Sequence, residues 1–133
     1  MIQNIPLIGI LIIATNVIVS LRGFKDDIFF NKYRFEIQKL HQGEYFRLFG
    51  SGFLHVNTTH LLFNMMTFYF FVEFVFSALG SIEFSLLYIG SLITGNLFAF
   101  TFHYDQPNYS AVGASGAVTG VYSAHFCYTL VLN

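Results

Sequence analysis

The sequence has few charged residues, a single cysteine and no run of basic residues. Only 10% of its 133 residues are Asp, Glu, Lys or Arg, whereas about a quarter is usual in soluble domains. The single cysteine, Cys127, has no partner in the chain, which excludes an internal disulfide. A net charge of −1 without a basic run argues against nucleic acid as a partner.

Apolar residues make up 55% of the chain. That is more apolar surface than a soluble core of this size can bury. The charges are also grouped, and they leave four long uncharged stretches: Met1–Leu21, Leu48–Val72, Phe84–Tyr104 and Gln106–Asn133. Each stretch is long enough for one helix across a hydrocarbon core of about 30 Å. The sequence therefore predicts an all-α, multi-pass membrane protein, in a plasma or inner membrane.

Four transmembrane helices are predicted, at about residues 5–21, 58–79, 83–103 and 115–132. We expect the first to be retained rather than cleaved as a signal peptide. Residues 1–6 carry no positive charge, and no small-x-small cleavage site stands out before Arg22. Four helices leave no room for a separate soluble domain, so residues 1–133 are expected to form one domain.

Residues 22–47 contain every Lys and Arg of the chain, with aromatic and apolar residues interleaved among them. This mixture is typical of a loop in the headgroup region, with the rings in the interface and the charges in water. The sequence therefore predicts an interfacial loop between the first and second helices. The positive-inside rule would place this basic loop in the cytoplasm.

A serine lies between glycines at the start of the last apolar helix, in Gly113-Ala114-Ser115-Gly116. Such a serine is either a small-residue packing site, the commoner case in membrane helices, or a nucleophile made accessible by the absence of neighbouring side chains. On the same helix, Gly116 and Gly120 are four residues apart, which favours close approach of another helix.

A second polar cluster comprises His55, His60 and Asn64, at the start of the second predicted helix. The hydroxyls and amide of Asn57-Thr58-Thr59 are candidate N-caps there. Polar groups are expensive in hydrocarbon, so the cluster calls for an explanation. His60 and Asn64 are four residues apart, hence on one helix face, and both can donate hydrogen bonds. Taken alone, they would be interpreted as residues that tie helices together. A metal site of His55 and His60 is disfavoured, because a five-residue offset would separate them around a helix.

Three segments, in order, resemble the rhomboid family of intramembrane serine proteases over about residues 43–122. They are Gly43-Glu44-Tyr45-Phe46-Arg47-Leu48, which is similar to the family's Trp-Arg loop segment, then His55-x4-His60-x3-Asn64, and Asn108-Tyr109-Ser110-Ala111-Val112-Gly113-Ala114-Ser115-Gly116. The resemblance implies that the four helices belong to a six-helix bundle. It also implies an N-terminus inside and loop 22–47 outside, contrary to the positive-inside rule, and we follow the resemblance here.

The resemblance also implies roles for individual residues. Ser115 would be the nucleophile, and His60 and Asn64 would bind the oxyanion together with the backbone around Gly113 and Ser115, with His55 close by. Transmembrane proteins cleaved near their outer ends would be the substrates, within the lipid bilayer. No cofactor and no metal are expected.

The general base is the missing part. In the rhomboid family the catalytic histidine lies on the sixth helix, and only four helices are predicted here. His125 follows Ser115 by ten residues on one helix, which separates the two by about 15 Å along the axis. His103, at the end of the third helix, is a weaker candidate, and His41 is expected to be a loop residue without a role.

We therefore interpret the chain as the N-terminal part of a rhomboid protease that holds the nucleophile and lacks the base, and expect it to be inactive by itself. The alternative is a non-catalytic rhomboid-like protein that binds membrane clients. The presence of Ser115, His60 and Asn64 argues against that alternative, and the missing base argues for it.

Overall fold

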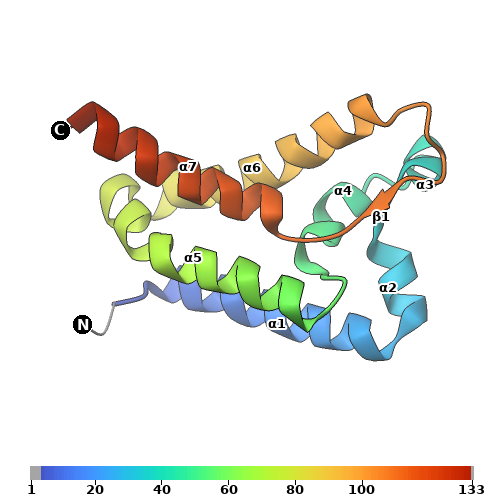
Figure 1. Ribbon diagram of the computed structural model, residues 1–133, viewed down its shortest axis with the longest axis horizontal. Helices are drawn as coiled ribbons and strands as arrows, with labels where there is room; N and C mark the ends of the chain where they lie inside the picture. Colours follow the sequence, from blue (N-terminus) through green and yellow to red (C-terminus); the bar gives the residue numbers. More distant parts are fainter. Residues whose placement is uncertain (1–3, 133) are drawn as a thin grey trace.

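A computed structural model describes residues 4–132; Met1, Ile2, Gln3 and Asn133, at the two ends of the predicted domain, lie outside the described residues. Most of the described chain is helical (Figure 1). The four long helices are α1 (Leu7–Lys25), α5 (Thr58–Leu79), α6 (Ser81–Phe102) and α7 (Ser115–Leu132). Helices α1, α5 and α6 are long and apolar enough to cross a membrane. They agree with a multi-pass membrane protein, whereas a fourth span at α7 stays a prediction.

The ends of the helices follow recognisable local signals. Helix α5 begins where the side chain of Asn57 accepts a hydrogen bond from the His60 N–H at 2.8 Å. Among the three predicted candidates, the cap is therefore Asn57. It ends at Gly80, whose φ of +86° suits a residue without a Cβ. Helix α1 runs to Lys25, past the predicted end before Arg22. Arg22 and Lys25 lie in its last turn, where their positive charges interact favourably with the helix dipole.

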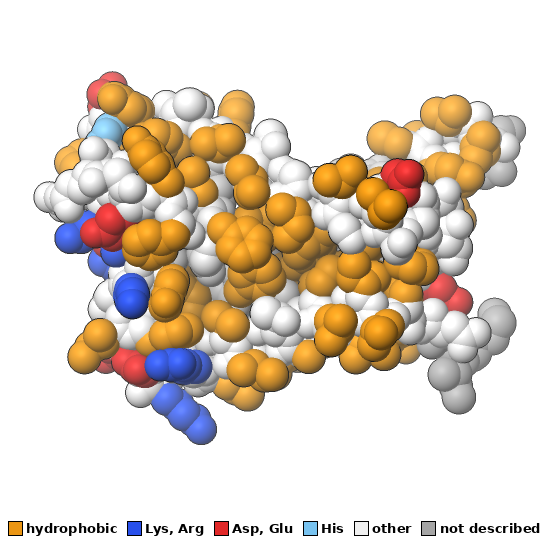
Figure 2. Space-filling model, turned by 180° about the vertical axis from the view of Figure 1, so that it is seen from behind, with side chains coloured by type: hydrophobic (Ala, Val, Ile, Leu, Met, Phe, Trp, Pro, Cys, Tyr) orange, Lys and Arg blue, Asp and Glu red, His pale blue; other side chains and the backbone are white. Residues whose placement is uncertain are grey.

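Helices α5, α6 and α7 enclose the main core, and α1 packs against it alongside α5 (Figure 1). The members of this core that are almost fully buried are Phe68, Val72, Val75, Phe84, Tyr88, Leu92, Ala114, Ala117 and Val121. Figure 2 shows the Lys and Arg side chains gathered at one end of the molecule, with apolar side chains over the surface between the two ends. That distribution suits an apolar bundle in lipid with its cations at one interface.

Small residues let α6 and α7 approach closely. The glycine pair of α7, Gly116 and Gly120, predicted such a contact. The Cα of Gly116 would lie 3.7 Å from a Cβ added at Gly95. A Cβ added at Gly120 would lie 2.5 Å from the Cβ of Ser91, whereas one at Gly116 would lie 3.5 Å from the Ser91 carbonyl oxygen, an ordinary contact. The backbone contact therefore depends on Gly120 far more than on Gly116.

We expect Gly120→Ala to lower the free energy of unfolding by about 1 to 3 kcal/mol, because overpacking forces the two helices apart. Gly116→Ala is the matched control and should cost less than about 0.5 kcal/mol. Unfolding in detergent by heat or by SDS measures both. Ser91→Gly in the Gly120→Ala background should restore stability. Equal effects of the two alanine variants would contradict this account of the contact.

The segment between α1 and α5 is more ordered than the predicted loop. It contains α2 (Asp27–Tyr33), β1 (Phe35–Glu36), α3 (Ile37–His41), α4 (Arg47–Gly50) and the 3-10 turn η1 (Ser51–Phe53). Strand β1 pairs antiparallel with β2 (Ser110–Ala111), with Phe35 opposite Ala111. The fold is all-α as predicted apart from this pairing, which at two residues is too short to leave a periodic pattern in the sequence.

A second, smaller core lies beneath this segment. Phe35, Ile37 and Leu40 are buried. Residues of α4, of α6 and of the segment before α7 pack against them: Leu48, Ala99, Phe100, Tyr109 and Ala111. Backbone hydrogen bonds extend the pairing, from the Ile37 N–H to Tyr109 O and from the Gln38 N–H to Pro107 O. The segment after α1 thus holds the segment that leads into α7.

Candidate active site

The backbone just before Ser115 is fixed by two hydrogen bonds from consecutive amides. The Gly113 N–H donates to Ser51 O at 3.0 Å, and the Ala114 N–H donates to His55 Nε2 at 3.4 Å. Gly113 has a φ of +131°, and an added Cβ would lie 2.7 Å from Cε1 of the His60 ring. Only glycine both adopts this positive φ without strain and leaves room for the His60 ring. The Gly113 amide is therefore already bonded in this structure, and the residue makes room for His60.

His55 is fully buried between α1 and this segment. Ser20 Oγ lies 2.9 Å from Phe53 O, to which it donates, and 2.8 Å from His55 Nδ1. Since a hydroxyl has one proton, Ser20 Oγ accepts from Nδ1–H, which leaves Nε2 as an acceptor. That assignment agrees with the amide of Ala114 donating to Nε2. The ring is thus neutral, with its proton on Nδ1.

The pKa of His55 is lowered from 6.5 to about 4, mainly by burial and also by the nearby His60, against the backbone of Phe53, which raises it. His55 precedes α5 and lies outside the three candidate spans. In the unfolded chain the imidazole takes up a proton near pH 6.5, whereas in the folded protein it resists until about pH 4. Stability attributable to a neutral His55 is therefore full above pH 6.5 and declines as the pH falls.

Acidification from pH 7 to pH 4.5 should lower the free energy of unfolding by about 2.5 kcal/mol through His55. The His55→Gln variant cannot be protonated, so it should lose less stability than the wild type over the same range. Thermal unfolding in detergent at both pH values gives the comparison. His60, whose ring lies 5.0 Å from that of His55, is present in both proteins. The same pH dependence in both would exclude His55 as the source.

Ser115 begins α7 and is exposed. Its side chain lines two cavities, one of about 240 Å³ shared with Asn64, Thr67, Val118, Thr119 and Tyr122, and one of about 200 Å³ toward Asn96 and Tyr109. Asn64 Nδ2 is buried, and among the described residues it has no hydrogen-bond partner. A buried amide without a partner is unusual and calls for an explanation.

His60 is half-buried on the first turn of α5, with its ring against Gly113. Its ring and that of His55 lie 5.0 Å apart in an edge-to-face arrangement. The sequence argument that the two histidines lie well apart was wrong, because His55 precedes the helix and is not displaced around it. The structure thus brings His55, His60, Asn64 and Ser115 to one region.

The other three histidines pack elsewhere. His125, on α7, lies between Phe71 and Phe74 of α5, with ring centroids 4.9 and 4.5 Å away. His103 stacks on Tyr109 at 3.6 Å. His41 bonds the backbone oxygen of Tyr104 at 2.9 Å, so it joins two segments and is more than a free loop residue.

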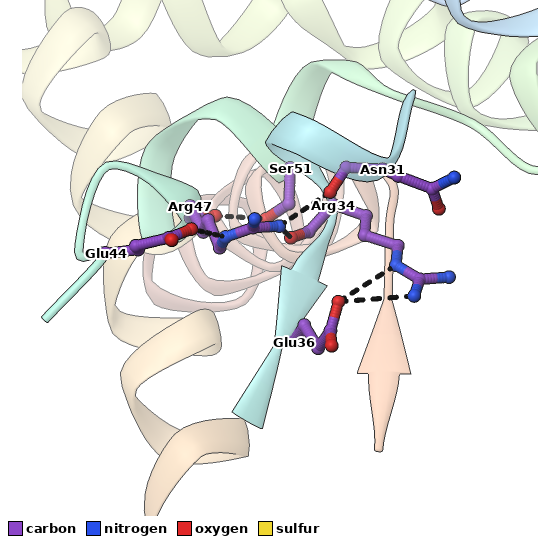
Figure 3. A network of polar contacts seen from close by, with 6 residues as sticks. All are labelled: Asn31, Arg34, Glu36, Glu44, Arg47 and Ser51. Atoms are coloured by element: carbon purple, nitrogen blue, oxygen red, sulfur yellow. Dashed lines mark hydrogen bonds and ion pairs between the residues drawn. The ribbon is translucent and has the colours of Figure 1, made fainter. Parts of the chain in front are cut away.

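Arg47 is buried within the segment that follows α1 and hydrogen-bonds to several of its residues (Figure 3). Only 4% of the residue is exposed, and its Nη1 donates to Asn31 O and to Arg34 O, both at 2.8 Å. Its Nε donates to Glu44 at 2.7 Å. The prediction that the charges of residues 22–47 lie in water therefore fails for Arg47.

Ser20 and Ser51 were not identified from the sequence. Ser20 carried a usable signal, since it is a polar residue within the apolar stretch of α1. Ser51 acts through its backbone oxygen toward Gly113, and a backbone contact is independent of residue type. The same applies to the carbonyl oxygen of Phe53 that Ser20 bonds.

Apolar helices that surround a polar cluster define a multi-pass membrane protein with a candidate site at one end of the bundle. Residues 42–132 match the family model described as a rhomboid domain. The chain belongs to the rhomboid family, as its sequence motifs predicted.

Two relatives from Bacillus subtilis (strain 168) are similar to the chain. One is the putative rhomboid protease YdcA, 38% identical over 91 residues, which are 68% of this chain and 45% of the relative. The other is the rhomboid protease GluP, 37% identical over 83 residues, which are 62% of this chain and 16% of the relative. The chain thus spans less than half the length of either relative.

Proposed function

We propose that this chain is part of an intramembrane serine protease that cleaves transmembrane proteins, with Ser115 as the nucleophile. The observation that supports this most is the cavity that Ser115 shares with Asn64, because the buried Nδ2 of Asn64 points to a missing acceptor. Protease names among the relatives support the same class. In this proposal α7 is a fourth span, and the loop of residues 22–47 lies at the outer face.

The reaction begins when Ser115 Oγ attacks a substrate carbonyl carbon, and the carbonyl oxygen becomes an oxyanion. The side-chain N–H of Asn64 and a ring N–H of His60 donate to that oxygen. The Ser115 N–H, at the first position of α7, is one of the amides that a helix leaves without an internal partner. The Gly113 amide donates to Ser51 O, so in this proposal Gly113 contributes its lack of a side chain instead of a hydrogen bond.

We propose that the base lies outside these residues. Among residues 4–132, no side chain hydrogen-bonds to the Ser115 hydroxyl, and His125 and His103 are engaged with aromatic rings. A serine without a base is a poor nucleophile, since losing one partner of a catalytic triad removes most of its advantage. The 133-residue chain should therefore be inactive, and coding sequence beyond codon 133 with a glycine-rich span and a histidine would supply the base.

The test uses the purified chain in lipid, with a labelled transmembrane substrate and a fluorophosphonate probe for an activated serine. We expect neither cleavage nor labelling. Labelling that disappears in Ser115→Ala would show that the base lies within these residues, and His103→Ala would then identify it.

A non-catalytic client-binding role is the second candidate, favoured by the absence of a hydrogen-bonded base at Ser115 among the described residues. It differs from the first in its response to Ser115→Ala. A client-binding protein would keep its membrane partners in pull-down from detergent when Ser115 is replaced. Cleavage of any substrate by a longer form would exclude it.

A further inference from the structure

The segment of residues 51–55 holds the backbone before Ser115 at two points. Ser51 O accepts from the Gly113 N–H at 3.0 Å, and His55 Nε2 accepts from the Ala114 N–H at 3.4 Å. Two consecutive amides bonded to one short segment leave the peptide planes before α7 little freedom to rotate. The direction in which Ser115 leaves the backbone therefore depends on where the segment of residues 51–55 lies.

Helix α1 determines that position. Ser20 Oγ donates to Phe53 O at 2.9 Å and accepts from His55 Nδ1 at 2.8 Å. One turn further along α1, Gly23 allows close packing of Leu54, since an added Cβ would lie 2.9 Å from Leu54 Cδ2. Three successive residues, 53 to 55, are thus seated on one face of α1.

The hydroxyl of Ser20 bonds outside its own helix. A serine or threonine in an apolar helix usually bonds the carbonyl oxygen four residues earlier, and Thr15 on the same helix does so with Leu11 O at 2.8 Å. Ser20 instead bonds Phe53 and His55, and both Ser20 and His55 are fully buried. Buried polar bonds of this kind specify one arrangement, because the alternative leaves a donor or an acceptor without a partner.

We propose that Ser20 and His55 are positioning residues through which α1 orients the backbone that carries the candidate nucleophile Ser115. The role of Ser115 as nucleophile rests on the proposed function. The hydrogen-bonded link from α1 to the backbone before Ser115 does not. Ser20 lies outside residues 42–132, the part matched by the family model. The link makes α1 a component of the site and more than a neighbouring helix.

Hydrogen exchange of single alanine amides tests the link on the intact chain. The protein is labelled with 15N-alanine and studied by NMR in detergent micelles, where Ala114 reports the bond to His55, while Ala78 and Ala99, within α5 and α6, report global stability. His55→Ala should speed exchange at Ala114 by about tenfold, the worth of one buried hydrogen bond. Ser20→Ala should speed it several-fold, because Nδ1–H loses its acceptor.

Two further variants separate positioning from general stability. His55→Gln restores an acceptor of similar reach and should bring Ala114 exchange back toward the wild-type rate. Thr15→Ala removes a hydroxyl of the same helix that bonds only Leu11 O and makes no hydrogen bond with residues 53–55. It should leave exchange at Ala114 unchanged. The proposal is overturned if Ala114 exchanges at the wild-type rate in Ser20→Ala and His55→Ala, or if Ala78 and Ala99 accelerate equally.

The exchange result also stands apart from catalysis. If Ala114 responds as expected but Ser115→Ala leaves the cleavage by a longer, active form unchanged, the link is real and the protease proposal is wrong. If cleavage depends on Ser115 but the exchange rate of the Ala114 amide is unchanged in Ser20→Ala and His55→Ala, the protease proposal stands and the link is rejected.

Discussion

Cleavage of a transmembrane substrate should be lost when Ser115 is replaced by alanine in a longer form of the protein that includes a base. The hydroxyl forms the covalent intermediate, so its removal leaves no nucleophile. His60→Ala and Asn64→Ala should each slow cleavage by about 10²- to 10³-fold, the usual cost of removing one oxyanion donor. The measurement is the initial rate of product formation in liposomes.

Stability and activity should separate at Asn64. Its Nδ2 has no partner among the described residues, so Asn64→Ala breaks no hydrogen bond of that atom in the folded protein and should barely change the unfolding temperature. Ser123→Ala, which removes an exposed hydroxyl from the same helix as Ser115, is the control and should cleave at the wild-type rate. Normal turnover by Ser115→Ala would refute the protease proposal. Normal turnover by both of the other variants would refute only the oxyanion role.

Arg47→Ala should lower the free energy of unfolding by at least about 3 kcal/mol. Its charged side chain donates to the backbone oxygens of Asn31 and Arg34 and to Glu44, and hydrogen bonds of charged groups are each worth about 1.5 to 3 kcal/mol. Arg47→Lys should recover only part of the loss, because an ammonium lacks the planar fork. Denaturant or SDS titration in micelles measures the change.

The matched control for Arg47 is Arg34, whose guanidinium pairs with Glu36 at 3.2 Å and is about one-third exposed. Exposed pairs contribute about 0 to 1 kcal/mol, so Arg34→Ala should have little effect. Arg47→Ala should also speed amide exchange at Ala111, because β1 follows Arg34 and pairs with Ala111. Equal destabilisation by the two alanine variants would show that the buried hydrogen bonds of Arg47 contribute no more to stability than the exposed ion pair of Arg34.

The long helices were predictable because each combines an uncharged stretch with a local end signal. The bounds of α5 were predicted as observed, since Asn57 and Gly80 mark its ends through their own side-chain and backbone properties. The end of α1 was predicted too early, because Arg22 was assumed to stop a helix that in fact tolerates cations in its last turn.

The details around the candidate site depended on contacts between distant segments. Nothing local distinguishes the buried Arg47 from the exposed cations of the same segment, because burial follows from the carbonyl oxygens of residues 31 and 34. The proximity of His55 to His60 could likewise not be predicted from the sequence, since it depends on the residue at which α5 begins. The motif of Ser115 was recognisable in sequence, whereas the bonds of Ser51, His55 and Ser20 that fix its backbone were not.

The pairing of β1 with β2 has a consequence for biosynthesis. Phe35 and Ala111 lie in the first third and the last quarter of the chain, and a contact of such long range forms late. While the ribosome is still synthesising α6, β1 has no partner and the segment of residues 51–55 has nothing to hold. The geometry around Ser115 is therefore completed only after residues 107–114 have been synthesised, when α1, α5 and α6 already exist in full.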